Sequence, residues 1–282
     1  MERNDMRALE ETGRAMEAAR RAARVRESLA SCDLCDHHCG VNRLAGVLGH
    51  CRAGAQTRVF SAQVEVSDEL ELIPTYAIAL SGCDMRCNFC ITGAQSWNPR
   101  AGEPLDLLKI ERGAEDALAE GARTIMILGG EPTVHLHAAL QIVSVLPESA
   151  TLVWKTNGHG SEEARRWLDG MFDLWVVDYK FGSDACANRL SGTMGYVESV
   201  RRNLLWARDH TGLIVRHLIM PGHVGCCWEP VAEWIAENIP HAKVNLRSGF
   251  WPAWRARKHP ELCGTVGEKE TRRAIEIAGL HG

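Results

Sequence analysis

From Thr75 onward, the sequence alternates between short apolar runs and longer segments whose apolar residues recur every three or four positions. Short apolar runs bounded by turn residues predict buried strands, and the longer period predicts amphipathic helices. The predicted strands are TYAIALSG, RTIMILGG, TLVWKTNG, DLWVVDYK, LIVRHLIMPG and AKVNLR. The predicted helices lie near residues 105–120, 135–145, 161–169, 184–209, 228–238 and 268–279. Six such alternations predict an α/β fold with a parallel sheet, because right-handed crossovers place each helix over the strands.

The residues before Thr75 follow a different pattern. Residues of about 5 to 30 predict one polar helix of Arg, Glu and Ala. The next segment, CDLCDHHCGVNRLAGVLGHCRAG, has too few apolar residues for a core of its own, and such units usually need a metal or cluster to fold. We therefore expect an N-terminal helix at 1–31, a four-cysteine metal-binding module at 32–72, and an α/β domain at 73–282 that ends in a Trp- and Arg-rich segment.

Composition narrows the possible partners. The 282 residues include 32 basic and 36 acidic side chains, a formal charge of −4, which makes a nucleic-acid partner unlikely. The apolar runs fall short of the roughly 20 residues that span a bilayer, so we expect no membrane segment or membrane partner. The N-terminal 30 residues contain six acidic residues and no apolar core, unlike a transit peptide or a secretory signal. Seven of the eleven cysteines form two tight clusters at metal-ligand spacing, which predicts a cytoplasmic protein.

The candidate chemistry lies at the ends of the predicted strands. Most of these strands end in a polar or glycine-containing turn: SGC, GGEP, TNG, DYK and MPG. The carboxyl ends of parallel strands converge on one face of an α/β fold, and ligands bind there. We therefore expect the functional residues in these turns.

Three cysteines, Cys83, Cys87 and Cys90, follow the first predicted strand with the spacing C-x3-C-x2-C, and Phe89 precedes the last of them. A cubane iron–sulfur cluster takes thiolate ligands and normally has four, so three cysteines leave one iron open. Two alternatives are a zinc site completed by a histidine and three unrelated buried thiols. The spacing, the aromatic neighbour and the position after the strand favour the cluster.

The loop LSGCDMRCNFC resembles the cluster loop of the radical S-adenosylmethionine superfamily, in its pyruvate formate-lyase activating enzyme branch. The turns GGEP, TNG and DYK resemble that branch, as does IVRHLIMPG, in which Arg216 or His217 would lie near the nucleoside. The resemblance is closest to activating-enzyme-like proteins that begin with a similar four-cysteine motif. It implies a partial (β/α)6 barrel and the following cofactor-binding residues: Gly129, Gly130, Glu131, Pro132, Lys155, Asn157, Asp178, Lys180, Arg216 and His217.

The resemblance also implies the chemistry. The amino and carboxylate groups of S-adenosylmethionine would chelate the open iron of a [4Fe–4S] cluster. One electron, from a donor such as flavodoxin or ferredoxin, would then cleave a C–S bond to give methionine and a 5′-deoxyadenosyl radical that abstracts hydrogen. The cofactor carries this chemistry, and the protein supplies position and a dry site.

One departure from the branch concerns Lys155. Activating enzymes have an Asp at this position, which helps to hold a monovalent cation near S-adenosylmethionine. The ammonium of Lys155 would replace that cation and place a fixed positive charge near the carboxylates. The alternative is that Lys155 points elsewhere and pairs with a surface acid.

Further cysteines lie outside the loop. A four-thiolate set, Cys32, Cys35, Cys39 and Cys51, fits zinc or a second iron–sulfur cluster, and we favour iron–sulfur. His37 and His38, inside this set, are expected beside the ligands or in solvent.

The adjacent pair Cys226 and Cys227 could supply a hydrogen atom, anchor a substrate or ligate a cluster, but packing as two small hydrophobes is favoured. Cys186 and Cys263 have no local pattern and are interpreted as structural.

The segment Ser248–Pro260, SGFWPAWRARKHP, combines two tryptophans with several basic residues. Such a segment binds a peptide, an anionic substrate or single-stranded nucleic acid, or it forms a packed flap with a solvated basic edge.

Three candidate functions follow from these observations. The first is a radical enzyme that acts on a protein or peptide, as glycyl-radical activation requires. The second is radical modification of a small molecule or ribosomally made peptide. The third is a non-catalytic zinc-binding interaction protein.

Overall fold

The structure, a computed structural model, describes residues 13–67 and 69–281. The start of the predicted N-terminal helix, up to residue 12, lies outside the described residues. The strands have the order β3-β1-β2-β4-β5-β6-β7-β8 in one sheet. The pairs β2–β4, β4–β5 and β7–β8 are parallel, so the predicted α/β class, a mostly parallel sheet of the partial-barrel type, is confirmed.

All six predicted strands are present. Two further strands were not predicted: β1 comes before the first predicted strand, and β3 lies between the first and second. The unpredicted β1 and β3 pair antiparallel at one end of the sheet, where the two-residue β3 is the edge strand, and β1 is half exposed, so its apolar pattern is weak. The strands are β1 (Arg58–Glu65), β2 (Thr75–Leu80), β3 (Glu103–Pro104), β4 (Thr124–Gly129), β5 (Leu152–Thr156), β6 (Leu174–Asp178), β7 (Gly212–Leu218) and β8 (Lys243–Arg247). Because β1 pairs with β2, part of the predicted module 32–72 belongs to the sheet. The predicted domain boundaries themselves stay predictions.

The helices agree with the predicted positions except that the one predicted at 184–209 is two helices. Gly192 ends the first with φ 67° and Gly195 precedes the second with φ 63°, and such left-handed residues break a helix. The helices are α2 (Arg14–Ser28), α3 (Ala94–Trp97), α4 (Leu107–Ala119), α5 (Leu136–Val143), α6 (Glu162–Leu168), α7 (Asp184–Ser191), α8 (Tyr196–His210), α9 (Glu229–Asn238) and α10 (Glu268–His281).

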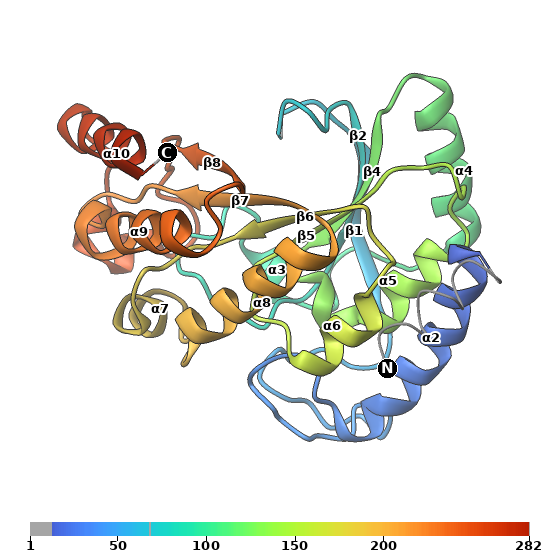
Figure 1. Cartoon of the computed structure of the whole chain (residues 1–282). Helices are drawn as coiled ribbons and strands as arrows, with labels where there is room; N and C mark the ends of the chain where they lie inside the picture. Colours follow the sequence, from blue (N-terminus) through green and yellow to red (C-terminus); the bar gives the residue numbers. More distant parts are fainter. Residues whose placement is uncertain (1–12, 68, 282) are drawn as a thin grey trace. The chain divides into compact units, whose positions relative to one another are not determined.

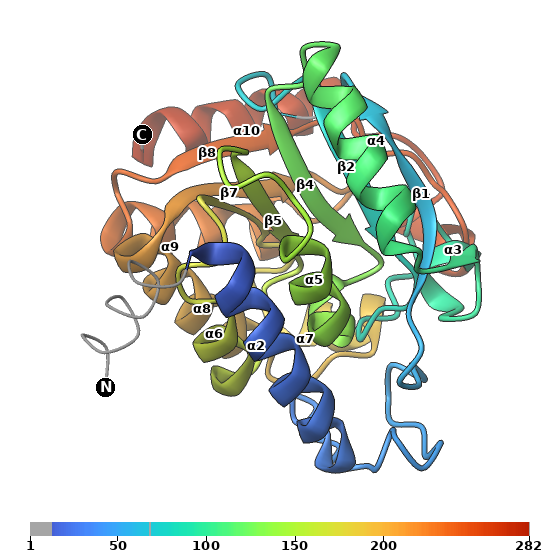
Figure 2. The ribbon, with the colours of Figure 1, turned by 90° about the vertical axis from the view of Figure 1, so that its right-hand side faces the viewer.

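The chain divides into two compact units. The first comprises Met1–Asp84, Gln95–Thr156 and Gly160–Trp175. In it, α4 packs on β1 and β2, and α2 runs alongside α5, with Ala18 and Ala22 buried on the face of α2 (Figure 2). Small residues on that face allow two helices to pack closely. The predicted N-terminal helix is therefore an integral layer of this unit.

The second unit comprises Met85–Ala94, Asn157–His159 and Val176–Gly282. Here β7 and β8 pair in parallel, α8 packs against β7, and α10 lies beside α9 (Figure 1). The indole of Trp228, in the π-helical turn Val224–Trp228 before α9, donates to the carbonyl of Ala274 in α10 at 2.9 Å. This unit holds the second half of the three-cysteine loop, because the chain passes from one unit to the other after Asp84.

Candidate functional site

The three-cysteine loop begins where β2 ends. Cys83 and Cys87 are buried and Cys90 is half-buried, and all three are free thiols. Gly82, just before the first cysteine, has φ 90°, a conformation that favours glycine. The loop therefore leaves the strand through a left-handed residue in the predicted SGC turn.

The GGEP turn after β4 contacts the start of this loop through backbone alone. The amide of Gly130 donates to the carbonyl of Leu80, and the amide of Glu131 donates to the carbonyl of Gly82, both at 2.9 Å. A Cβ on Gly130 would lie 2.1 Å from the Gly82 oxygen, and a Cβ on Gly129 would lie 2.1 Å from the Leu80 oxygen. The two glycines are thus required for the approach of the turn to the loop.

The side chain of Glu131 is buried and accepts hydrogen bonds from residues of the first unit. Its Oε1 accepts hydrogen bonds from the Thr133 amide at 3.1 Å, the Thr133 hydroxyl at 2.6 Å and the Thr156 hydroxyl at 2.8 Å. Pro132 follows at the first position of a short 3₁₀ helix, Pro132–His135, where a missing N–H costs nothing. Glu131 therefore ties the GGEP turn to the end of β5.

The residues of the TNG turn that belong to the second unit are fixed by two polar side chains of α8. Tyr196 donates its hydroxyl to the carbonyl of Asn157 at 3.2 Å, and Asn203 donates to the carbonyl of Gly158 at 2.7 Å. The Asn157 side-chain oxygen accepts from the His159 amide at 2.9 Å. Tyr196 and Asn203 had no sequence signal of their own, because their roles depend on α8 packing beneath the turn.

The DYK turn and β7 form a charged cluster in the second unit. The Asp178 carboxylate pairs with Lys180 Nζ at 2.5 Å and with Arg216 Nε at 2.6 Å, and the three side chains are 18–24% exposed. Burial favours the neutral amine of Lys180, but the charges of Asp178 and a Cys87 thiolate outweigh it and raise its pKa. Counted without Cys87, the three side chains carry a net charge of +1, so the cluster suits an anionic group of a ligand.

His217, next to Arg216 on β7, points to the opposite face, as neighbouring residues of a strand do. Its ring lies 5.1 Å from that of Trp228, and its Nδ1 is 2.6 Å from the Tyr179 carbonyl. Burial lowers the pKa of His217 to about 4, so the ring is neutral and donates from Nδ1. Of the pair singled out in the sequence, Arg216 joins the Asp178 cluster and His217 joins the core.

Lys155 is buried in the first unit. Its Nζ lies 3.9 Å from Glu69, and the two side chains are 10% and 0% exposed. The partner is an acid from the segment between β1 and β2, and it is not on the surface. The structure thus gives the ammonium a buried anionic neighbour, a contact that the sequence did not suggest.

The N-terminal cysteines lie in a hydrogen-bonded loop of the first unit. The amide of Cys32 donates to Val41 at 3.0 Å, and Cys35 forms a β-bridge to Gly160. Burial, followed by the charges of Asp84, Cys51 and Cys32, raises the pKa of Cys35 well above its usual value. Arg43 is buried here with its guanidinium 3.5 Å from the Cys32 sulfur, and so offsets part of the negative charge of a thiolate.

The two histidines inside this set differ. His37 stacks on His50 with ring centroids 3.8 Å apart, and its Nε2 is 3.0 Å from the carbonyl of Asp84, next to Cys83. His38 is exposed, with Nδ1 2.6 Å from Asp33. The N-terminal cysteine loop therefore lies beside the start of the three-cysteine loop.

The Trp-rich segment Ser248–Pro260 packs on the second half of the three-cysteine loop. The amide of Arg255 donates to the carbonyl of Asn88 at 2.8 Å, and a Cβ on Gly93 would lie 2.9 Å from the Trp254 ring. Trp251 remains 68% exposed and Trp254 43% exposed, and the Arg255 guanidinium lies over the Trp254 ring at 5.2 Å. An exposed aromatic surface thus adjoins the loop.

A third thiol cluster, which the sequence did not predict, lies in the second unit. Cys186 and His223 lie beside the pair Cys226 and Cys227, although Cys186 is far away in the sequence. The ligand atoms of all four residues lie within 4.8 Å of one another. The adjacent cysteines were the only local signal, and convergence through the fold was invisible in the sequence.

No helix in the described part of the chain is long and apolar enough to cross a membrane.

A family model described as the Radical SAM superfamily matches residues 78–235. The Uncharacterized protein MJ0674 of Methanocaldococcus jannaschii is 29% identical over 262 residues, which cover 88% of this chain and 74% of that protein. The matched region spans β2 to α9 and so includes the three-cysteine loop and the GGEP, TNG and DYK turns.

Solved structures are similar in fold. Streptococcus suis SuiB bound to precursor peptide SuiA has a TM-score of 0.53 at 15% identity, over 70% of this chain and 43% of SuiB. SuiB bound to S-adenosylmethionine gives 0.53 at 16% identity, over 70% and 44%. TYW1 with a lysine-pyruvate adduct has a TM-score of 0.51 at 11% identity, over 84% of this chain and 85% of TYW1. This chain therefore spans less than half of SuiB.

Proposed function

This chain belongs to the radical SAM superfamily and is an enzyme of that class, and we propose that Cys83, Cys87 and Cys90 hold a [4Fe–4S] cluster at which S-adenosylmethionine binds. The observation that carries the proposal is the backbone contact of Gly130 and Glu131 with Leu80 and Gly82, which fixes the GGEP turn against the start of the loop. Free thiols are the donor set that an iron–sulfur cluster requires. When bound, the cluster would supply the electron that cleaves S-adenosylmethionine.

We assign the cofactor-binding roles by the chemistry of each turn. The GGEP turn would accept an amino group through its oxygens, since the amide of Gly130 is already bonded to Leu80. The net positive cluster of Asp178, Lys180 and Arg216 suits a carboxylate or a ribose hydroxyl. Asn157 positions its turn. These roles, with Glu131 and Pro132 as the frame of the turn, are carried over from the superfamily.

Between Arg216 and His217, the proposal favours Arg216 as the residue near the nucleoside. Its guanidinium is bound to the Asp178 carboxylate and partly exposed, whereas the ring of His217 is buried against Trp228. Replacing His217 by Asn should therefore change stability more than affinity for S-adenosylmethionine, and Arg216→Met should do the reverse.

Lys155 keeps its proposed role as a fixed cation beside the cofactor, with Glu69 as its anionic neighbour. The expected result for Lys155→Met is a roughly tenfold weaker affinity for S-adenosylmethionine, about 1.4 kcal/mol, because an ammonium is removed. Lys155→Arg keeps the charge and is the matched control. Isothermal titration of anaerobic, cluster-loaded protein measures both, and equal affinities of the Met and wild-type proteins would remove Lys155 from the site.

The experiment that tests the main proposal is anaerobic. Reconstituted protein, given S-adenosylmethionine and dithionite, should release 5′-deoxyadenosine, and the Cys83→Ala/Cys87→Ala/Cys90→Ala protein should release none. Cys263→Ala is the matched control, because that thiol is exposed and contacts only backbone oxygens. Equal release from the triple variant and the control would contradict the assignment of the cluster.

For the substrate we propose a protein or peptide, in the manner of the activating-enzyme branch. The support is the exposed Trp251 and Trp254 next to the three-cysteine loop, since exposed aromatics and a stacked Arg form peptide-binding surfaces. The solved SuiB structure contains a precursor peptide, which makes a ribosomally made peptide the second candidate. Superfamily membership leaves the third reading, non-catalytic zinc binding, without support.

The measurement that separates the substrates is the transfer of deuterium into 5′-deoxyadenosine. A deuterated glycyl-radical-enzyme partner should label it if the first candidate holds, and a deuterated peptide should label it if the second holds. Trp251→Ala should reduce either transfer without changing release in the absence of substrate. Label from neither polymer, together with label from a small molecule, would contradict the peptide proposal.

We propose a second iron–sulfur cluster at Cys32, Cys35, Cys39 and Cys51, with zinc as the alternative. This set lies beside Asp84, which supports a role close to the first cluster. His37 contacts the carbonyl of Asp84, and the charge of Asp84 contributes to the raised pKa of Cys35. An electron donor such as flavodoxin or ferredoxin, in a reducing cytoplasm, completes the proposal and agrees with eleven free cysteines in the chain.

A further inference from the structure

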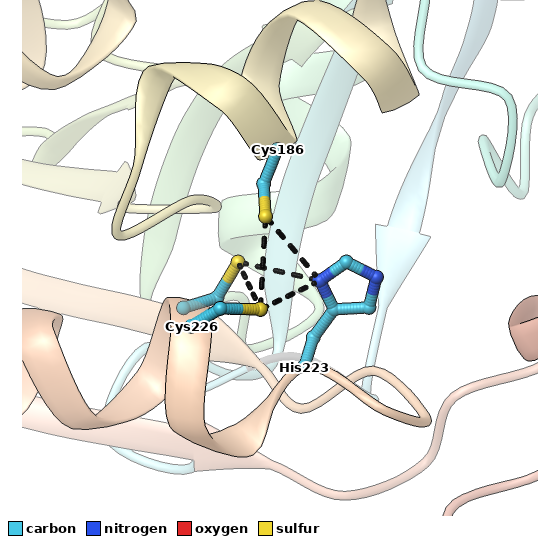
Figure 3. A group of neighbouring side chains, drawn as sticks. Cys186, His223 and Cys226 are labelled. Carbon is cyan, nitrogen blue, oxygen red and sulfur yellow. Dashed lines mark hydrogen bonds between the residues drawn. The ribbon is translucent and has the colours of Figure 1, made fainter.

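Four ligand atoms meet in the second unit, away from the three-cysteine loop. His223 Nδ1 lies 3.7 Å from Cys186 Sγ, 3.3 Å from Cys226 Sγ and 3.5 Å from Cys227 Sγ. Cys226 Sγ lies 3.6 Å from Cys186 Sγ and 4.0 Å from Cys227 Sγ. Figure 3 shows Cys186 pointing down toward Cys226 from one helix while His223 approaches from the side.

These separations match the edges of a tetrahedron around one ion. Zinc–sulfur bonds of about 2.3 Å and zinc–nitrogen bonds of about 2.0 Å, at tetrahedral angles, place sulfurs about 3.8 Å apart and sulfur and nitrogen about 3.5 Å apart. The five separations given above lie close to those values. We propose that Cys186, His223, Cys226 and Cys227 form a structural zinc site.

The residues around His223 fit this role. With Nδ1 directed at the sulfurs, the other ring nitrogen, Nε2, carries the proton and faces the Glu261 carboxylate at 3.8 Å; the Arg189 guanidinium, 3.3 Å away, is a donor only and is not its acceptor. A ligating histidine usually directs its second nitrogen toward a carboxylate, which fixes the ring. The ion pair of Arg189 and Glu261 holds that carboxylate in place.

The local backbone is built to bring the ligands together. Adjacent residues on an ordinary α-helix do not face the same point, but the π-helical turn Val224–Trp228 lets Cys226 and Cys227 both approach His223. A Cβ on Gly182 would lie 2.4 Å from the Cys227 carbonyl, so this glycine allows the start of α7 to lie against the turn. Ser183 caps α7 by accepting from the Cys186 amide at 3.3 Å.

One ion suits this site better than a cluster does. The ligands of a cubane bind different metal atoms and therefore lie farther apart than ligands of a single ion. Four protein ligands also leave no open position, which is characteristic of structural zinc. The site is thus distinct from the proposed cluster loop and does not depend on S-adenosylmethionine chemistry.

The last turn of α7 forms hydrogen bonds with the three-cysteine loop. The carbonyls of Ser191 and Leu190 accept from the amides of Arg86 and Asn88 at 2.9 Å, on either side of Cys87. Zinc at the first turn of α7 would thus fix the helix whose last turn holds the backbone around Cys87.

The first test is the zinc content of purified full-length protein. Cys226→Ser should lose about one zinc per chain relative to Cys263→Ser, because one ligand is removed in the first variant and none in the second. Cys226 is exposed, which favours folding of this variant. Circular dichroism checks the fold. Equal zinc content in the two proteins, or iron in place of zinc at this site, would overturn the proposal.

The second test needs no variant. Wild-type protein is alkylated with iodoacetamide before and after removal of zinc with a chelator, and each cysteine is followed by mass spectrometry. Zinc should slow alkylation of Cys226 at least roughly tenfold and leave Cys263 unchanged, because a bound thiolate is not a free nucleophile. A rate at Cys226 that is independent of zinc would disprove the site.

Discussion

The two four-ligand sets of this chain contrast in how they are built. Cys32, Cys35, Cys39 and Cys51 lie within 20 positions of one another and form a recognisable motif in the first unit. The second set, Cys186, His223, Cys226 and Cys227, comes from α7, the residue before the π-helical turn and the turn itself, all in the second unit, and forms no motif. Among the described residues, the second set gathers its ligand atoms within 4.8 Å, and the first set is not gathered in that way.

The spacing of cysteines in the sequence and the distances between ligand atoms give different information about a metal site. A motif marks thiols that serve together, but it leaves the kind of metal open. Ligand separation addresses that question, because one ion needs its ligands closer than a cluster does. The close second set thus fits zinc, and the iron–sulfur cluster at the first set stays a proposal that metal analysis tests.

The largest effect is expected for the N-terminal set. Cys35→Ser in the Cys83→Ala/Cys87→Ala/Cys90→Ala background should remove about four irons per chain, because a cubane loses stability without one of its thiolates. The loop around it should lose roughly several kcal/mol of folding free energy, since small metal modules fold on binding. Iron and zinc analysis with protease mapping measures both. Zinc in place of iron in the background protein would reverse the contrast between the two sets.

A smaller loss is expected for Gly182→Ala. The added methyl would meet the Cys227 carbonyl at 2.4 Å and push α7 from the π-helical turn, at a cost of about 3 kcal/mol, with zinc released. Urea unfolding and zinc analysis measure the change. Gly264→Ala is the matched control, since a Cβ there meets nothing within 4 Å. Full zinc retention in the Gly182 variant would argue against that contact as the basis of the site.

Low pH should lower the stability of the first unit near its cysteine loop. Burial lowers the pKa of His137 from 6.5 to about 4, and its Nε2 donates to the carbonyl of Ala55 at 3.0 Å. Between pH 6.5 and 4 the unfolded chain binds more protons than the folded chain, so stability falls as pH falls, by about 2 kcal/mol at pH 5 from this group. Thermal unfolding at pH 7 and pH 5 measures the loss.

The matched variants for this titration are His137→Gln and the exposed His241→Gln. The first keeps a donor for Ala55 and should reduce the loss between pH 7 and pH 5, while the second should leave it as in wild type. The same pH dependence in all three proteins would show that His137 is not the group responsible.

The smallest effect is expected at the cap of α7. Ser183→Ala removes the acceptor of the Cys186 amide and should cost about 1 kcal/mol, with zinc bound more weakly but still bound. Ser183→Asp keeps an acceptor and is the control. Competition with a chromogenic chelator measures zinc affinity. An unchanged affinity in the Ala variant would mean that the cap does not position Cys186.

Much of the fold was predictable, and the failures have physical reasons. The six strands and their turns were found because each strand is a short apolar run ending in Gly or a polar residue. The strand β1 was missed because half-exposed residues weaken its pattern. The break between α7 and α8 was missed although Gly192 and Gly195 mark it.

The candidate site was predictable only where its residues are adjacent in sequence. The loop and the turns GGEP, TNG and DYK are local motifs. The roles of Tyr196, Glu69 and Cys186 depend on which segments the fold brings together, and nothing near those residues signals a partner. Arg216 and His217 could not be separated in the sequence, because the direction of each along β7 depends on strand register.

The contact between the GGEP turn and the cluster loop has a consequence for how such enzymes diversify. At Gly129 and Gly130 even one methyl group would collide with the carbonyls of Leu80 and Gly82, so descendants of this protein are confined to glycine there. Trp251, largely exposed, is under no such restriction. Substrate preference is therefore free to drift during evolution while the two glycines stay fixed.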